Sequence, residues 1–141
     1  MKAIAVVDAS ALAAIAFNEP LGAEMTQRLV DRELVAPRLL QFELTNAAVR
    51  KVKKHPEHAA VIRAGLERAL ADDMAIVWSD VDPGAVLDLA VSTGLTAYDA
   101  AYLWLARHLD ADLVTLDSDL AAAAARSLGI QREQRQPPVG S

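Results

Sequence analysis

The stretch "IAVVDASALAAIAF" (residues 4–17) decides how the chain folds, because a short apolar run ends abruptly at a carboxylate. Residues 3–7 are small and β-branched apolar residues, a composition typical of a buried strand. Asp8 and Ser10 follow, and residues 10–17 then have the pattern of a helix. In open parallel sheets, sites form where the strands end. Asp8 marks such a site only if other acids occupy comparable places further along.

Short apolar segments alternate with helical ones along the rest of the chain. Strands are predicted at residues 3–7, 34–37, 75–78 and 112–116, and a short fifth strand after Gly129 is left open. Helices are predicted at residues 10–17, 21–32, 38–54, 56–71, 82–94, 96–109 and 118–129, the last ended by Gly129. This alternation predicts an α/β fold in three layers, with a central, mostly parallel sheet of four or five short strands flanked by helices.

The composition indicates one domain. The chain has 141 residues, of which 53% are hydrophobic and 23% charged, as expected for a compact protein with one core. We find no internal repeat and no linker, so we expect a single domain over residues 1–130. Residues 131–141 are polar and proline-rich, and we expect them to form a mobile tail.

Composition also excludes several classes of protein. No apolar run approaches the ~20 residues of a membrane span, and Asp8 interrupts the N-terminal apolar run before it reaches the length of a signal-peptide core. We therefore expect a cytoplasmic protein without membrane contact. The chain has no cysteine, which rules out disulfides and thiolate metal sites. A net charge of −5 argues against a broad basic face for duplex DNA, but it allows a local basic patch.

Four acids fall at places that a parallel sheet brings together. Asp8 follows the first predicted strand and Asp117 follows the fourth, while Glu43 and Asp99 lie near the starts of two helices. Because helices that follow parallel strands begin at the carboxyl edge, all four side chains are expected to converge there. Carboxylates that share a small site raise one another's pKa, and a divalent cation relieves this repulsion. An all-oxygen set favours Mg²⁺ or Mn²⁺ over zinc.

Each acid also has a purely structural interpretation. Asp8 and Asp117 can cap the helices that follow them, and Asp99 completes a pattern similar to a capping box with Thr96. Glu43 can be a solvated residue on its helix. Capping and cation binding are compatible, so both interpretations stay open at this point.

Four motifs resemble, in order and spacing, those of PIN-domain ribonucleases, and within these the small VapC-type toxins of toxin–antitoxin pairs. They are "VVDASAL", "ELTNAA", "TAYDAAYLWLA" and "LVTLDSDLAAAA", and the resemblance spans about residues 4–130. It implies a PIN-like fold, an acidic pocket that binds Mg²⁺ or Mn²⁺, and endoribonuclease activity. The catalytic and metal-binding acids it implies are Asp8, Glu43, Asp99 and Asp117, with Asp8 and Asp99 as the first choice for direct ligands. The supporting polar residues it implies are Ser10, Asn46 and Thr115.

The resemblance also implies partners: an RNA substrate, a separately encoded antitoxin protein and a second copy of the chain in a homodimer. The helix predicted at residues 38–54 ends in a basic run that includes Arg50, Lys51 and Lys54. Arg50 lies two turns beyond Glu43 on the same face, so this run is expected to guide the RNA backbone toward the pocket. Its alternative role is to stabilise the helix C-terminus.

Two other functions remain as alternatives. One is a PIN-like RNA-binding or regulatory module without catalysis, against which the complete set of four acids argues. The other is an aspartate-based phosphohydrolase, which also places an acid after its first strand. The haloacid-dehalogenase pattern requires a second aspartate where this chain has Ser10, and a receiver domain requires a lysine where "LVTLDSD" supplies acids.

Overall fold

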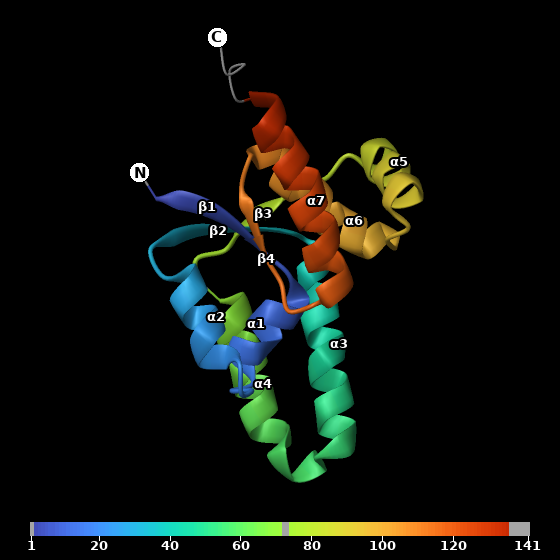
Figure 1. The fold of residues 1–141 in the computed structure, drawn as a ribbon. Coiled ribbons are helices and arrows are strands. Elements are labelled where there is room, and N and C mark those ends of the chain that lie inside the picture. Colours follow the sequence, from blue (N-terminus) through green and yellow to red (C-terminus); the bar gives the residue numbers. More distant parts are fainter. Residues whose placement is uncertain (1, 72–73, 136–141) are drawn as a thin grey trace.

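The computed structural model describes residues 2–71 and 74–135, which form four strands and a set of flanking helices (Figure 1). The strands are β1 (Ala3–Val7), β2 (Arg32–Pro37), β3 (Val77–Ser79) and β4 (Asp112–Val114). The α-helices are α1 (Ala9–Ala16), α2 (Gly22–Leu29), α3 (Leu39–Lys54), α4 (Ala59–Leu70), α5 (Pro83–Thr93), α6 (Ala97–Leu109) and α7 (Ser118–Arg135), and a 3₁₀ turn, η1, spans Pro56–His58.

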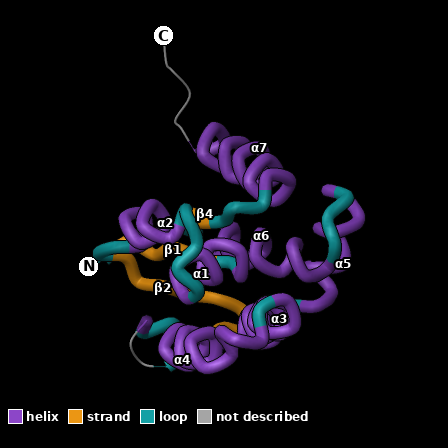
Figure 2. Tube along the Cα trace, turned by 90° about the horizontal axis from the view of Figure 1, so that it is seen from below, coloured by secondary structure: helices purple, strands orange, loops and turns teal. Residues whose placement is uncertain are grey.

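The strands form one sheet in the order β3-β2-β1-β4, and every neighbouring pair is parallel. Helices cover both faces. In Figure 1, α1, α2 and α4 lie below the sheet and α6 lies above it, in contact with β1, β2 and β4. Figure 2 shows the sheet from below, with α2 and α1 over the β1–β4 side and α3 and α4 at the β2 side. The predicted three-layer α/β fold is therefore confirmed.

Local sequence signals explain where several helices begin and end. Asp8 caps α1, and Asp82, followed by Pro83 at the first helical position, caps α5. Gly94 ends α5 with a positive φ of 76°, a conformation that glycine adopts without steric cost. Thr96 then caps α6 by accepting a hydrogen bond from the Asp99 N–H.

Some predicted boundaries were wrong. The helix expected at residues 21–32 ends at Leu29, because Val30 is extended and Asp31 turns the chain with a φ of 59°. Arg32 instead begins β2. The last helix does not stop at Gly129 but continues to Arg135, so no strand follows Gly129 among residues 130–135. A single glycine inside a helix costs only about 1 kcal/mol relative to alanine. Of the expected tail at 131–141, residues 136–141 lie outside the described residues.

The helix α1 is held between α2 and α4 at two glycines. A Cβ at Gly22 would lie 2.4 Å from the carbonyl oxygen of Ala14, and a Cβ at Gly65 would lie 2.3 Å from that of Ala16. No side chain fits at these distances, so the absence of a side chain is what allows α2 and α4 to approach the end of α1. Four residues of α1 are buried in the core, including Leu12.

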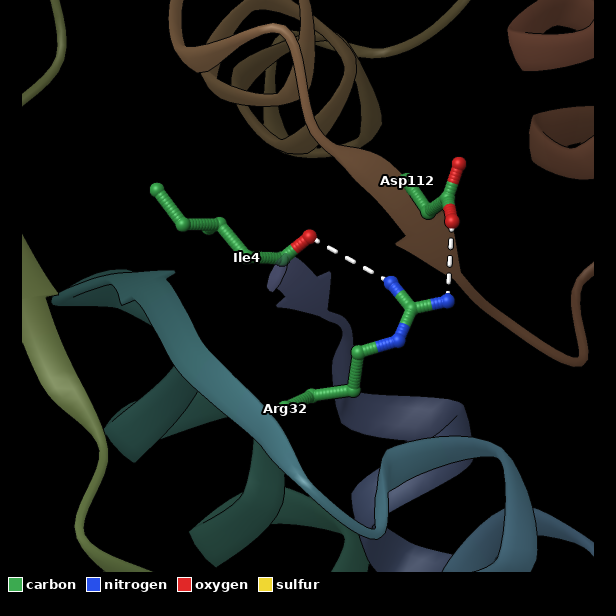
Figure 3. A network of polar contacts seen from close by, with 3 residues as sticks. All are labelled: Ile4, Arg32 and Asp112. Atoms are coloured by element: carbon green, nitrogen blue, oxygen red, sulfur yellow. Dashed lines mark hydrogen bonds and ion pairs between the residues drawn. The ribbon is translucent and has the colours of Figure 1, made fainter. Parts of the chain in front are cut away.

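The amino edge of the sheet carries a polar network that links three strands (Figure 3). The Arg32 guanidinium, at the start of β2, donates to the Asp112 carboxylate of β4 at 2.9 Å and to the Ile4 carbonyl of β1 at 3.4 Å. Opposite charges therefore meet at this edge, remote from the strand ends where the predicted acids lie.

In the parts of the chain that the structure describes, no helix combines the length and the apolar character that crossing a membrane requires.

Candidate functional site

Asp8 is the most buried acid of the predicted set, with 5% of its surface exposed. It lies where β1 ends and α1 begins, and its Oδ1 accepts hydrogen bonds from Ser10 Oγ at 2.7 Å and from the Ala11 N–H at 3.0 Å. Its Oδ2 accepts a bond of 2.5 Å from Thr115 Oγ1. Three donors thus fix the carboxylate in one orientation at the carboxyl edge of the sheet.

Ser10 and Thr115 connect Asp8 to the end of β4. While Ser10 Oγ donates to Asp8, it accepts a bond of 2.9 Å from the Leu116 N–H. Thr115 Oγ1 likewise accepts from the Asp117 N–H at 3.0 Å. Both hydroxyls therefore bridge the ends of β1 and β4 and contact Asp8 directly, while the supporting role that the resemblance implied for them stays a prediction. Asn46, the third supporting residue, faces a groove beside the acids.

Glu43 lies on the first turns of α3 and is held by a residue that the sequence analysis did not assign to the site. Tyr102 of α6 donates its hydroxyl to Glu43 Oε1 at 2.5 Å. Tyr102 is almost fully buried, with 1% of its surface exposed. Its spacing of three residues from Asp99 puts both side chains on one face of α6, and this spacing is the sequence signal that could have identified it.

Asp99 and Asp117 lie at the same carboxyl edge of the sheet. We call the four acids Asp8, Glu43, Asp99 and Asp117 the rim, and the helices that carry Asp99 and Asp117 explain where these two lie. Asp99 lies in the first turn of α6, where its N–H is bonded to Thr96. Asp117 precedes α7 and its Oδ1 accepts from the Leu120 N–H at 2.8 Å, so it caps that helix as the structural interpretation predicted. The same is true of Asp8 at α1. Capping accounts for how these acids are positioned without excluding a further role.

Burial and neighbouring carboxylates raise the pKa of three of the acids, Asp8, Glu43 and Asp99. Burial raises the pKa of Asp8; the Thr115, Ala11 and Ser10 bonds oppose this, and the Asp117 charge adds to it. Burial also raises the pKa of Glu43; the Tyr102 bond opposes it, and Asp99 and Asp8 reinforce it. The pKa of Asp99 is raised by burial and then by Asp117, Asp8 and Asp119. Carboxylates therefore gather here, and Asp8, Glu43 and Asp99 form no ion pair with any residue in the parts of the chain that the structure describes.

The donor chemistry of the rim fits a hard divalent cation, since every member is a carboxylate. In the described parts of the chain, no three acidic or histidine side chains lie close enough together to hold one ion in this conformation. The acids lie at the same edge of the sheet, and their carboxylates would have to move closer together to bind one ion. The fit to Mg²⁺ or Mn²⁺ thus rests on donor type and mutual repulsion.

A groove of about 520 Å³ runs from the acids along α1 and α3. Its walls include Ser10, Glu43 and Asn46 near the acids, and Arg50 and Lys54 further along α3. Lys51 also lines it, but its Nζ forms a 2.8 Å ion pair with Glu19 and lies 5.6 Å from the centre of the Phe17 ring. Arg50 and Lys54 make no such pair within the described chain, so they are the cations that this groove presents to a ligand.

A second hollow, of about 340 Å³, opens on the other side of Asp99. The turn between α5 and α6 contributes Thr93 and Thr96, and α7 contributes Asp119 and Arg126. Asp119 lies in the first turn of α7, where the helix dipole favours an acid, and Arg126 lies further along the same helix. Acids of the rim thus line two separate hollows, one that also contains Arg50, Lys51 and Lys54 and one that also contains Arg126.

Comparison with known proteins agrees with this geometry. The PIN domain family matches residues 5–126, a range that includes all four acids of the rim. The chain belongs to the PIN domain family. PIN domains are generally nucleases and typically use divalent metal ions, so the shared rim of carboxylates has an expected chemistry.

A solved structure supports the same conclusion over nearly the whole length. The crystal structure of PAE2754 from Pyrobaculum aerophilum is 26% identical to this PIN domain and superposes with a TM-score of 0.71. The match covers 95% of this chain and 98% of that one. No curated protein matches the sequence significantly.

Proposed function

We propose that this PIN domain is a Mg²⁺- or Mn²⁺-dependent endoribonuclease that hydrolyses RNA phosphodiester bonds. The observation that carries the proposal is the convergence of Asp8, Glu43 and Asp99 at the carboxyl edge of the sheet, where burial raises the pKa of each and neighbouring carboxylates raise it further. A protein gains nothing in stability from gathering unpaired like charges. Their retention is explained if a cation and a phosphate bind there, as in the family to which the chain belongs.

The residues of the rim divide into holding and orienting roles. Asp8, Asp99 and Asp117 would hold the ion, with Glu43 contributing through water. When bound, Mg²⁺ or Mn²⁺ supplies Lewis acidity toward water and toward the phosphate oxygens. Ser10 and Thr115 fix the Asp8 carboxylate, so little reorganisation is needed when the substrate arrives.

Glu43 would orient the attacking water. Tyr102 holds Oε1 of Glu43, which leaves Oε2 available to accept a proton from a water beside the phosphorus atom. Burial raises the pKa of Tyr102 far above its ordinary value, so the phenol stays protonated and donates throughout the working pH range. Tyr102 is therefore a positioning residue that acts through Glu43.

The groove between α1 and α3 would receive the RNA backbone. Arg50 and Lys54 line the same groove as Glu43, which supports their predicted role in guiding phosphates toward the rim. Lys51 contributes less, because Glu19 already pairs with it.

The biological role we propose is that of the toxin of a VapBC-type pair in the cytoplasm, as a homodimer that a separate antitoxin inhibits. The support for this finer role is the order and spacing of the four motifs along the chain. Exposed apolar side chains on α3 and α5, such as Phe42 and Val91, offer surface for protein partners.

The decisive experiment is cleavage of a pool of structured RNAs by the purified protein. Wild type, Asp8→Asn and Asp8→Ala would be compared with Mg²⁺, with Mn²⁺ and with EDTA. We expect cleavage by wild type that requires the metal and that both variants lack while remaining folded by circular dichroism. Equal cleavage by folded Asp8→Asn would refute the assigned site. RNA binding without cleavage by wild type would favour a binding module.

A further inference from the structure

The hollow beside α7 contains an arginine that the proposed reaction has not used. Arg126 is exposed on α7, seven residues beyond Asp119, and both residues line the hollow with Asp99. Two threonines of the α5–α6 turn, Thr93 and Thr96, form the opposite wall. Arg126 makes no ion pair or hydrogen bond with any residue in the described parts of the chain, so its guanidinium is free to bind an anion.

The position of this hollow matters because a polynucleotide continues on both sides of the bond that is cut. The groove between α1 and α3 meets the rim at Ser10 and Glu43, and the hollow meets it at Asp99 and Asp119. In Figure 1, α7 lies against α6 on the side of the sheet away from α4. The two openings share no lining residue, so each meets the rim at a different acid, Glu43 or Asp99.

We propose that the hollow binds the RNA backbone on the second flank of the scissile phosphate and that Arg126 is the positioning residue that holds a phosphate there. This proposal rests on the proposed function. The new element is that the two flanks of the substrate are bound by different basic side chains. Arg50 and Lys54 bind one flank, and Arg126 binds the other. The guanidinium suits this task, since it can bind a phosphate through two parallel hydrogen bonds.

The charges of the hollow make the binding conditional. Asp99 and Asp119 carry negative charge beside the single positive charge of Arg126, so a phosphate is repelled while the acids are unneutralised. A divalent cation on the rim would remove that repulsion and leave Arg126 and the first-turn amides of α6 to attract the phosphate. Arg126 should therefore contribute to RNA binding with Mg²⁺ and contribute little with EDTA.

The test measures binding separately from cleavage. Fluorescein-labelled single-stranded RNA of mixed sequence would be titrated with Glu43→Gln protein, which keeps the three aspartates proposed to hold the ion and which we expect not to cleave, with and without Arg126→Ala. With Mg²⁺, we expect Arg126→Ala to weaken binding by about 3- to 10-fold and to reduce the salt dependence by about one phosphate contact. Arg126→Lys should restore part of the affinity. Arg68→Ala, which changes the same charge at an exposed position of α4 that lines neither opening, is the matched control.

Cleavage by otherwise wild-type protein gives the second readout. Arg126→Ala should raise KM with little change in kcat, and trimming one flank of a cleaved RNA should abolish this effect while preserving the effect of Arg50→Ala. Trimming the other flank should do the reverse. If wild type cleaves RNA and Arg126→Ala matches Arg68→Ala in binding and in KM, the inference is wrong while the proposed function stands. If wild type neither cleaves nor binds RNA, the proposed function itself fails.

Discussion

The two edges of the sheet treat charge in opposite ways. At the amino edge, Arg32 of β2 pairs with Asp112 of β4 at 2.9 Å and also reaches the Ile4 carbonyl of β1. At the carboxyl edge, Asp8, Glu43 and Asp99 are held by neutral donors or by helix starts, and burial together with neighbouring carboxylates raises the pKa of each. The first edge satisfies its charges within the protein, whereas the second leaves its charges for a ligand.

This difference separates stability from function along one set of strands. A charged side chain that forms an ion pair within the chain contributes to stability and is not available to bind a ligand. Carboxylates that share a rim without a cation oppose folding, and natural proteins keep such groups where activity depends on them. Substitutions at the carboxyl edge should therefore reduce cleavage, whereas substitutions at the amino edge should reduce stability.

The largest effect is expected at the carboxyl edge. Asp99→Asn removes one rim charge with almost no change in shape, and we expect metal-dependent RNA cleavage to fall by about 10²- to 10³-fold. Asp88→Asn, an exposed acid on α5, should cleave like wild type. A folded Asp99→Asn protein that keeps full activity would remove Asp99 from the site.

The next effect concerns Tyr102, which links α6 to the rim through Glu43. The hydrogen bond from Tyr102 holds the pKa of Glu43 down, so Tyr102→Phe should raise that pKa and delay ionisation to higher pH. We expect cleavage on the acidic limb of the pH–rate profile to fall by about tenfold, which corresponds to about 1.4 kcal/mol, with recovery as the pH rises.

The control for this prediction is Tyr98→Phe, which removes a hydroxyl that is exposed on the same helix. Its pH–rate profile should overlay that of wild type. A Tyr102→Phe profile that is lowered equally at every pH would mean that the phenol supports packing rather than the ionisation of Glu43.

At the amino edge, a substitution should change the stability of the protein and leave its activity unchanged. Arg32→Met breaks the link between three strands and should lower the free energy of unfolding by about 0.5–1 kcal/mol, because the pair is only partly exposed. Cleavage should be unchanged. Arg63→Met disrupts a looser, more exposed pair of 3.9 Å with Glu67 and should not shift the urea midpoint. Lost cleavage in stable Arg32→Met protein would contradict the separation of the two edges.

The smallest effect is the stability of the rim itself. Because the folded pKa values of Asp8, Glu43 and Asp99 are raised, the folded protein holds more protons than the unfolded chain between about pH 4 and those raised values. In EDTA, stability from these groups is therefore greatest below about pH 4 and falls as the pH rises through the folded pKa values.

Asp99→Asn should flatten this dependence and stabilise the protein near neutral pH by less than about 1 kcal/mol, since solvent screens a side chain that is only partly buried. Urea unfolding at several pH values, with EDTA, measures the slope. Added Mg²⁺ should stabilise wild type more than Asp99→Asn. Identical slopes for the two proteins would contradict the repulsion at the rim.

Sequence could predict the part of the site that depends on where elements begin and end. Asp8 and Asp117 follow strands, and Glu43 and Asp99 open helices, so the topology of a parallel sheet was enough to bring them to one edge. The same reasoning failed at Arg32, because the turn at Asp31 needs a positive φ that no nearby glycine signalled. It also failed at Gly129, where a glycine that could have ended the helix lies inside α7.

Contacts between elements distant in the sequence could not be predicted. Tyr102 and Glu43 are 59 residues apart, and their bond depends on how α6 crosses the sheet relative to α3. The pairing of Lys51 with Glu19 also depends on how α1 and α3 pack, and it removes one cation from the groove. Arg126 reaches the rim only because α7 lies beside α6.

The close approach of α1 to its neighbours constrains how this protein can diverge. Gly22 and Gly65 touch the last carbonyls of an eight-residue helix whose first residue follows Asp8. A side chain at either position would clash with that carbonyl, so either α1 or the neighbouring helix would have to move. Since α1 begins directly after Asp8, two positions on helices that never reach the rim therefore constrain the backbone that positions this carboxylate.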